Sequence, residues 1–341
     1  MRQNANRQIR IHKLAVFLSL SLLGRQAMAQ GTNGQGSLTA PCLTFNRQIL
    51  DDLSHNRLQD AESALSRKLS EYPTSLGRSC DWLILGNRAV VAARLGQLDR
   101  AENYAARAVG IAEKLCNSDD PMLLRPLATL GSVRFEQNKI AGALQVFERM
   151  RLIRTESPAD LAFIHNAAGA LLLTQGRNQE AEAEYLLSIA SYEQSGYGET
   201  ADTAGVLIML ARAYMSDRRF PEALRALDRA GTALDSASDA VPMDRIKLLN
   251  TRAAVHGDMG RWPDACEDLA AAVSLADSAS GNSAIQQSGL LANYALVLRK
   301  NRRSREARQI ESRASELNAT SLGNALVDKS ELLAKTNTVG K

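Results

Sequence analysis

The sequence predicts an all-α fold, a solenoid in which helical hairpins stack one on the next. Small residues, turn residues and helix-start residues recur at a near-constant spacing of 42 along most of the chain, as expected where one helical unit is repeated. The composition agrees with helices. Of the 341 residues, 45% are hydrophobic but only 4% are aromatic, whereas a sheet favours β-branched and aromatic residues.

The small residue that opens each second helix sets the register. Its copies lie 42, 38, 42, 42 and 42 residues apart, at Ala101, Ala143, Ala181, Ala223, Ala265 and Ala307. A degenerate copy at Ala61 lies 40 residues before the first, which is typical of a terminal capping repeat. The short step after Ala143 lacks about one helical turn and predicts a shorter second helix there. With the marker alanine numbered 20, we expect core side chains at positions 4, 8, 11, 20, 24 and 27 of each unit.

Turns and helix starts keep the same register. The turns are centred on Gly96, Asn138, Gly176, Arg218, Gly260 and Arg302. Asp160, Asp202 and Asp244 lie 42 apart, two residues after Pro158, Thr200 and Pro242. A proline in the first turn with an acidic residue close behind suits a helix N-terminus, where amides are free and the helix dipole favours anions.

The stretch from Asn166 to Tyr185 shows the whole pattern. A small pair, Ala168-Gly169, precedes the turn Gly176, and Ala181 and Tyr185 follow four residues apart on one helix face. This resembles a tetratricopeptide repeat. The 42-residue spacing resembles the kinesin-light-chain-like branch of that family, which also carries asparagine in the first helix, here Asn87, Asn166, Asn250 and Asn293. The resemblance covers about residues 42–317 and implies a right-handed superhelix of about six hairpins plus a degenerate first repeat, in a secreted bacterial protein.

The first 29 residues have the features of a secretory signal peptide. A basic start precedes an apolar run at 14–24 and the cleavage motif Ala27-Met28-Ala29. The alternative is an uncleaved N-terminal anchor. Cleavage near Ala29 would leave 36 basic against 37 acidic residues, a balance that argues against nucleic-acid binding. We therefore expect a secreted protein, periplasmic if its source is a Gram-negative bacterium.

The remaining boundaries follow from composition and register. Residues 30–41 are rich in Gly, Asn, Thr and Ser and predict a flexible linker. The solenoid is expected over 42–318. Residues 319–341 break the register and predict a short capping element and a disordered tail. An alternative is that this tail lies in the groove of the solenoid as a pseudo-ligand.

No catalytic or cofactor motif is present in the sequence. Metalloprotease, hydrolase, P-loop and dinucleotide-binding signatures are all missing. His55, His165 and His256 have no companions at ligand spacing, so structural roles are the better interpretation. We expect a protein without enzymatic activity, cofactor or metal.

The four cysteines matter because an exported protein reaches an oxidising compartment. Cys42 and Cys80 open first helices in adjacent units, and Cys116 closes the second helix of the unit that Cys80 opens. Cys42–Cys80 and Cys80–Cys116 are both candidate disulfides, and the first would fix the degenerate repeat in place. Cys266 is expected to be a free thiol.

A stripe of the first helices is the candidate binding site. Helical solenoids bind partners on a concave wall, and the family resemblance implies that positions 2, 5, 9 and 12 face it. In the central units these positions hold Arg125, Ser132, Phe135, Phe163, Asn166, Leu173, Ile208, Arg212, Met215, Lys247 and Asn250.

Apolar residues, amides and cations together suit an extended peptide. Amides pair with a peptide backbone, apolar pockets take side chains and cations take a carboxylate. We expect a protein or peptide partner, acidic or with a free C-terminal carboxylate, bound by a scaffold or adaptor. A sensor of a small peptide signal is the alternative function, and an enzyme is a third. The alternative for the apolar residues is that they only complete packing between first helices.

A second candidate surface is basic. Six cations lie within ten residues near the last turn, namely Arg299, Lys300, Arg302, Arg303, Arg305 and Arg308. They could contact an anionic membrane surface or an acidic partner. No aromatic residue lies among them to stack on nucleic acid bases. A solvated turn is the alternative interpretation.

Overall fold

The computed structural model describes residues 40–54, 57–71, 80–238, 240–278 and 284–317. The predicted signal peptide, the linker up to residue 39, the tail 319–341 and His55 lie outside these residues. The described residues divide into two compact units, one up to residue 251 and one from residue 252 onward. Each unit is described by itself.

All regular structure among the described residues is helical. The first unit contains α2 (Ala40–Ser54), α3 (Leu58–Glu71), α4 (Asp81–Arg94), α5 (Leu98–Ala112), the short 3-10 helix η2 (Pro121–Leu123), α6 (Leu124–Glu136), α7 (Ile140–Met150), α8 (Pro158–Thr174), α9 (Asn178–Gln194), α10 (Ala201–Ser216), α11 (Phe220–Ser236) and the start of α12 (Pro242–Asp258). The second contains the end of α12, α13 (Trp262–Ser278), α14 (Ala284–Lys300) and helical residues 304–317.

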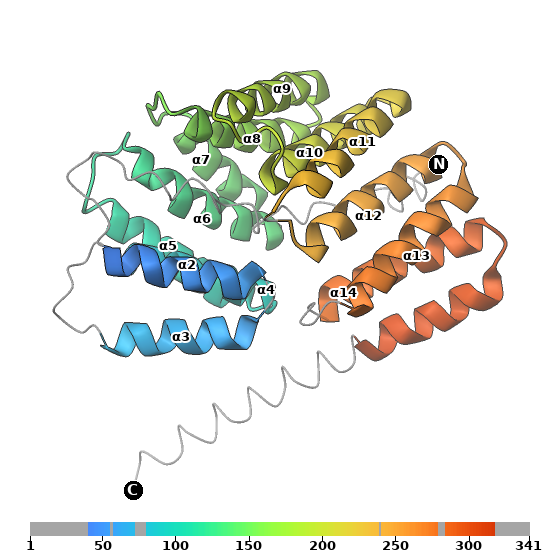
Figure 1. The fold of residues 1–341 in the computed structure, drawn as a ribbon, viewed down its shortest axis with the longest axis horizontal. Helices are drawn as coiled ribbons and strands as arrows, with labels where there is room; N and C mark the ends of the chain where they lie inside the picture. Colours follow the sequence, from blue (N-terminus) through green and yellow to red (C-terminus); the bar gives the residue numbers. More distant parts are fainter. Residues whose placement is uncertain (1–39, 55–56, 72–79, 239, 279–283, 318–341) are drawn as a thin grey trace, which may run out of the picture. The chain divides into compact units, whose positions relative to one another are not determined.

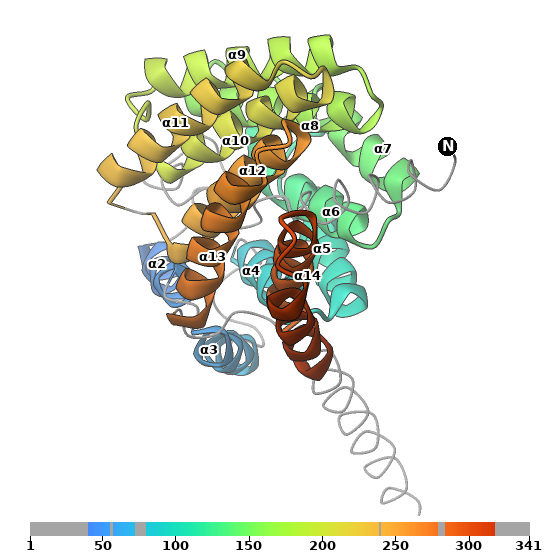
Figure 2. The ribbon, with the colours of Figure 1, turned by 90° about the vertical axis from the view of Figure 1, so that its right-hand side faces the viewer.

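In the first unit, consecutive helices pair as antiparallel hairpins, and neighbouring hairpins contact each other. In the first unit α4 packs on α5, α6 on α7, α8 on α9 and α10 on α11, and α5 contacts α6 as α9 contacts α10 (Figure 1). The green and yellow helices α8 to α11 show this stacking in side view (Figure 2). The predicted all-α solenoid is confirmed. Helix α2 begins at Ala40, two residues before the predicted start of the solenoid.

Each predicted turn has the same backbone geometry. The central residue has a positive φ, namely Gly96, Asn138, Gly176, Arg218, Gly260 and Arg302. In the first of these turns the amide of Gln97 donates to the carbonyl of Ala92, and the amide of Gly96 donates to that of Ala93. This pair of hydrogen bonds is a Schellman motif, which satisfies the free carbonyls of the preceding helix. The equivalent turns at 138, 176, 218, 260 and 302 repeat its outer bond.

The marker alanines are all fully buried, from Ala61 to Ala307. Positions 20 and 27 are buried in every central unit, as the repeat predicts. Positions 4 and 11 are less regular, since His165, Leu249, Arg134 and Tyr214 are only half-buried. The prediction that positions 4 and 11 are core positions in every unit is therefore wrong for these four residues. Their polar or large side chains extend past the core, as Arg134 does to reach Glu102 at 3.0 Å.

Positions 8 and 24 form a size-matched pair where the two helices of a hairpin cross. A Cβ atom on Gly131 would lie 2.7 Å from Cε1 of Phe147, and one on Gly169 would lie 2.7 Å from Cε1 of Tyr185. In the next unit the pair is Ala211 with Leu227, and both are fully buried. An aromatic ring at position 24 thus requires glycine at position 8, because the helix backbone fills the remaining space.

Neighbouring second helices are joined by a repeated ion pair. Arginine at position 26 contacts an acidic residue at position 32 of the preceding unit: Arg149 with Glu113, Arg229 with Glu193, and Arg313 with Asp277. Exposed pairs of this kind contribute little energy each. Their recurrence in both units shows that the stacking geometry itself repeats.

Helix α7 explains the single short step of the repeat. It has 11 residues, whereas α9 and α11 have 17 each. The deletion predicted from the 38-residue step therefore shortens the second helix of that unit, and the turn at Asn138 and the buried Ala143 keep their places.

The size-matched pair can be tested with Gly169→Ala. The added methyl group collides with the buried Tyr185 ring, and we expect a net loss of about 1–3 kcal/mol in the free energy of unfolding. Gly110 lies inside α5 with no atom within 4 Å of its added Cβ, so Gly110→Ala should stabilise by about 0.5–1 kcal/mol. Chemical denaturation measures both.

A double variant distinguishes collision from a general intolerance of substitution. Gly169→Ala with Tyr185→Leu recreates the Ala–Leu pair of the next hairpin, so its cost should be smaller than the sum of the two single changes. Additive losses would contradict the size-matching explanation.

Candidate ligand-binding surface

The predicted stripe lies on α6, α8, α10 and α12, the first helices of consecutive hairpins. Ser132, Ile208, Arg212 and Met215 are buried. The other seven are half-buried, namely Arg125, Phe135, Phe163, Asn166, Leu173, Lys247 and Asn250. No member of the stripe is fully exposed. Phe135 and Phe163 pack against the core cluster around Leu127 and Phe147. Core packing therefore explains why these two stripe positions are aromatic, without a ligand.

Arg212 on α10 is the most deeply buried cation of the stripe. Only 5% of its surface is exposed. Burial lowers the pKa of its guanidinium to about 10, and the nearby Tyr185 opposes this change. Nη1 of Arg212 lies 4.0 Å from Sδ of Met209. A cation in such surroundings loses much of its hydration, so a ligand anion that reached it would be attracted strongly.

Tyr185 adds a polar atom near this cation, and Asn166 on α8 is a further buried polar residue of the stripe. The Tyr185 ring packs over Gly169, which lies one turn from Asn166 on α8. The Tyr185 hydroxyl and Asn166 Oδ1 are both buried without a hydrogen-bond partner among the described residues. Each buried polar group left unpaired costs about 1–3 kcal/mol. The structure therefore holds an unpaired hydroxyl near a buried guanidinium and an unpaired amide oxygen on α8.

Arg125 at the start of α6 is a second desolvated cation. Its Nη1 atom is buried and has no hydrogen-bond partner among the described residues. Burial alone lowers the pKa of this guanidinium to about 10. Its ordinary pKa is 12.5, so Arg125 remains charged at neutral pH.

Glu136 at the end of α6 is a site residue that the sequence reasoning missed. Burial raises the pKa of this carboxyl to about 7, and Lys247 on α12 partly offsets the effect. A signal was available in the sequence: Glu136 follows Phe135 of the predicted stripe and lies eleven residues after Arg125. Lys247 also lies 3.7 Å from Asp244 on its own helix. The stripe therefore includes a titratable acid as well as cations.

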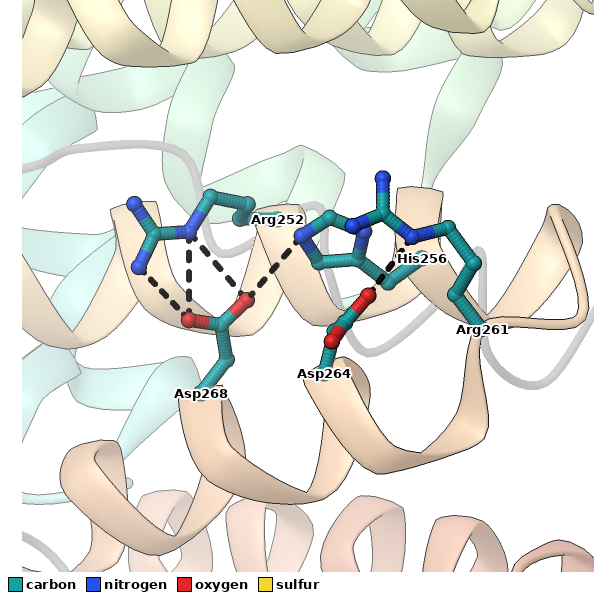
Figure 3. A network of polar contacts seen from close by, with 5 residues as sticks. All are labelled: Arg252, His256, Arg261, Asp264 and Asp268. Carbon is teal, nitrogen blue, oxygen red and sulfur yellow. Dashed lines mark hydrogen bonds and ion pairs between the residues drawn. The ribbon is translucent and has the colours of Figure 1, made fainter.

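The second unit contains a separate polar network, drawn in Figure 3. Arg252 on α12 donates to both carboxylate oxygens of Asp268 on α13, with its Nη2 at 2.6 Å from Oδ1 and its Nε at 3.2 Å from Oδ2. His256 Nε2 lies 3.8 Å from Asp268 Oδ2. Burial lowers the pKa of His256 despite the attraction of Asp268. Arg261 and Asp264 form a more exposed pair three residues apart.

The histidines hold structural positions. His165 Nδ1 lies 2.7 Å from Oε2 of Glu184 within the α8–α9 hairpin, and His256 belongs to the network of Figure 3. Among the described residues no group of histidine, cysteine and acidic side chains could hold a metal ion.

A disulfide joins Cys42 on α2 to Cys80 at the start of α4, with a Cα–Cα distance of 6.0 Å. Of the two pairings left open by the sequence, the structure contains this one. Cys116 and Cys266 are free. Burial raises the pKa of the Cys116 thiol to about 11, so little reactive thiolate forms there near neutral pH.

The basic cluster near the last turn is largely compensated. Arg299 forms two hydrogen bonds to Glu311, and Arg303 forms two to Glu306. Lys300 lies over the Trp262 ring at 6.0 Å. Arg302, Arg305 and Arg308 complete the cluster on the surface. This arrangement favours a solvated turn over a concentrated anion-binding surface. No helix among the residues described is long and apolar enough to cross a membrane.

These features define an α-solenoid of helical hairpins with a partly desolvated polar stripe. Residues 83–151, which span the α4–α5 and α6–α7 hairpins, match the family model described as Tetratricopeptide repeat. Over these residues the chain is similar to tetratricopeptide repeats. No curated protein matches its sequence.

Several solved structures have a similar fold. A Rap protein complexed with competence and sporulation factor has 16% identity and a TM-score of 0.61, over 84% of this chain and 77% of that one. BtubC (BKLC) from P. vanneervenii has 19% identity and a TM-score of 0.54, over 66% and 92%. NprR in complex with its cognate peptide NprX has 14% identity and a TM-score of 0.52, over 84% of each chain. At these identities the likeness is one of fold.

The two ion pairs of Figure 3 provide a matched test of burial. Asp268 is 6% exposed, so Asp268→Asn leaves Arg252 with a weaker partner in a low-dielectric site and should cost about 2–4 kcal/mol. The side chain of Asp264 is 38% exposed, and Asp264→Asn should cost less than about 1 kcal/mol. Denaturant titration at pH 7 measures both losses. Equal losses would contradict the view that burial makes the Asp268 pair the more important one.

Proposed function

We propose that this protein is a non-catalytic interaction scaffold outside the cytoplasm that binds a protein or an extended peptide along the first-helix stripe. The observation that carries the proposal is a set of buried polar groups on α8, α9 and α10. Asn166 Oδ1 on α8 and the Tyr185 hydroxyl on α9 are buried without partners among the described residues, and Tyr185 lies near the buried guanidinium of Arg212. An unpaired amide oxygen such as Asn166 Oδ1 destabilises the fold, and a bound chain would supply its partner.

The chemistry of the stripe favours a peptide over other ligands. An asparagine side chain can accept from and donate to a peptide backbone, and a guanidinium can bind a carboxylate with two hydrogen bonds. The preferred ligand is therefore acidic or ends in a free carboxylate. Nucleic acid is disfavoured by the near-neutral charge expected after removal of the leader, and a membrane contact through the basic cluster would be weak because glutamates pair with part of it.

Two solved relatives in fold support the same class of ligand. The Rap protein was solved with competence and sporulation factor, and NprR with its cognate peptide. Both alignments extend over most of the present chain. They also favour a second candidate function, in which the solenoid is a regulatory sensor of a short peptide signal.

The location outside the cytoplasm is supported by the leader and by the cysteines. The sequence of residues 1–29 has the pattern of a secretory signal. The Cys42–Cys80 disulfide would persist in an oxidising compartment. It closes a 38-residue separation between α2 and α4, and the chain-entropy model assigns such a link about 4 kcal/mol.

Thiol counting tests this location. After export, alkylation of the unfolded protein without reductant should label two cysteines, Cys116 and Cys266, whereas reduced protein should show four. The variant Cys42→Ser with Cys80→Ser should unfold at a lower temperature, by an amount that corresponds to about 2–4 kcal/mol. Four free thiols in protein isolated from cells, or recovery in the cytoplasmic fraction at its full length, would count against an exported scaffold.

Partner binding is tested with single neutral substitutions in the stripe. We expect Asn166→Ala and Arg212→Gln each to reduce recovery of crosslinked partners from the envelope fraction by about tenfold, because each removes a hydrogen-bonding group in a desolvated site. Arg225→Gln on the exposed face of α11 is the control, and thermal unfolding shows which variants are folded. Folded stripe variants that recover partners as well as the control would contradict the proposed site.

A further inference from the structure

The solvent-facing side of helix α9 is apolar. The opposite side of this helix packs on α8, where the Tyr185 ring covers Gly169. On the side that points away from α8, Leu186 is 47% exposed and Leu187 is 50% exposed. Three other exposed large hydrophobic residues lie just past the end of a helix, namely Leu115, Leu152 and Met259. The two leucines of α9 lie instead in the middle of a 17-residue helix, so the end of a helix does not explain their exposure.

Two alanines extend this apolar side in both directions along the helix. Ala183 and Ala190 are exposed, and their spacing of three and four residues from the leucines places them on the same face. We call these four residues the α9 seam, since spacings of three and four are those at which two helices pack together. The same positions of the next second helix, α11, are exposed and polar, namely Arg225, Asp228, Arg229 and Thr232. The repeat itself therefore does not require an apolar surface here.

The exposed residues of α9 are arranged symmetrically about the centre of the seam. Four pairs lie at equal distances from this centre: Leu186 with Leu187, Ala183 with Ala190, Glu180 with Glu193, and Gln179 with Gln194. All of these side chains are exposed. A two-fold axis between Leu186 and Leu187 therefore brings each of them opposite a residue of its own type on an antiparallel second copy of α9. A two-fold contact requires one surface that fits itself, and this helix face meets that requirement.

The charges at the two ends of this face are complementary in the same arrangement. At the amino end, Arg177 donates two hydrogen bonds to Glu180, at 2.7 and 2.6 Å. At the carboxyl end, Glu193 is paired with Arg229 of α11. An antiparallel copy brings the first pair of one chain beside the second pair of the other, so each arginine meets a second glutamate. Opposite ends of the two helix dipoles also come together, which is favourable.

We propose that this protein self-associates through α9, with the α9 seams of two copies packed antiparallel about a two-fold axis between Leu186 and Leu187. One helix from each chain forms the contact, which is smaller than the interface of a permanent dimer. We therefore expect monomer and dimer in equilibrium, with a dissociation constant in the micromolar range. The seam lies on a second helix and points away from the first-helix stripe, so this inference is independent of the proposed function. A dimer would carry two stripes and bind a ligand with two epitopes more tightly than a monomer does.

Sedimentation of the purified protein over a range of concentrations measures the dimer. The variant Leu186→Glu with Leu187→Glu should raise the dissociation constant about tenfold or more, because the symmetry places four carboxylates in one desolvated contact. Both leucines are exposed and glutamate is a good helix former, so this variant should unfold at about the temperature of the parent protein. Ala270→Glu with Ala271→Glu adds the same charges at the equivalent exposed positions of α13. This control should dimerise as the parent protein does.

Cysteine crosslinking determines the orientation of the two helices. In a background with Cys116→Ser and Cys266→Ala, one protein carries Ala183→Cys and a second carries Ala190→Cys. The antiparallel contact places these two positions opposite each other, where Cα atoms within about 7 Å can form a disulfide. In either protein alone, the two equivalent thiols would lie about 10 Å apart along the helix axis. Oxidation of the mixture should therefore give at least tenfold more crosslinked dimer than oxidation of either protein alone.

Other results would overturn the proposal. Protein that stays monomeric up to millimolar concentration does so, and so does a dimer that tolerates the two glutamates as well as it tolerates the control substitutions. Crosslinks within each cysteine variant but not in the mixture would indicate a parallel contact. Slow alkylation of Leu187→Cys in monomeric protein would show that another part of the chain covers the α9 seam in place of a second copy. Partner recovery through Asn166 and Arg212 reports on the first-helix stripe whichever result is obtained.

Discussion

The close approach of two helices within each hairpin is the constraint on which the solenoid depends. A helix backbone can come near its neighbour only where side chains are small, and the marker alanines meet this need at every crossing. The pair at positions 8 and 24 refines the rule, with glycine against an aromatic ring and alanine against leucine. Because each hairpin is built on the same crossing, the next hairpin meets an equivalent surface. Repetition of the stack follows from that equivalence.

The stack also determines which polar groups lose water. The first helices present their stripe to one another, so a side chain there is buried by several hairpins at once. Arg125, Glu136 and Arg212 have shifted pKa values for this reason, with desolvation as the largest cause in each case. On the second helices, by contrast, the repeated arginine–carboxylate pairs lie at the surface. The second helices therefore carry exposed ion pairs, whereas the first helices carry charges that burial has removed from water.

Local features of the fold could be predicted from the sequence because they depend on short-range chemistry. A residue with positive φ terminates each first helix, and glycine or asparagine at four of the six turns marks the position directly. Arg218 and Arg302 adopt the same positive φ although arginine does not favour it. These two turns could be located only from their spacing in the repeat. The shortened α7 followed from counting residues between Ala143 and Ala181.

The candidate site could be predicted only in part. Stripe positions come from helical periodicity, but the degree of burial depends on neighbours that are tens of residues away. Glu136 was missed because an acidic residue next to a turn is usually solvated. Arg134, at an expected core position, instead reaches Glu102 on the preceding hairpin. A charged side chain can extend past the core in this way. The sequence pattern does not show where the charged group of such a side chain lies.

Sequence variation in a repeat protein can change the ligand without changing the scaffold. The positions that control stacking are 8, 20, 24 and 27, and none of them is a stripe position. Under the proposed function, substitutions at the half-buried polar positions of the stripe would alter the recognised chemistry while the crossings stay intact. Arg125 and Arg212 occupy positions 2 and 9 of different units, so each unit contributes its own contact. If the proposed function holds, the specificity of this chain would be set by which units carry a desolvated charge and by how far apart along the helices those charges lie.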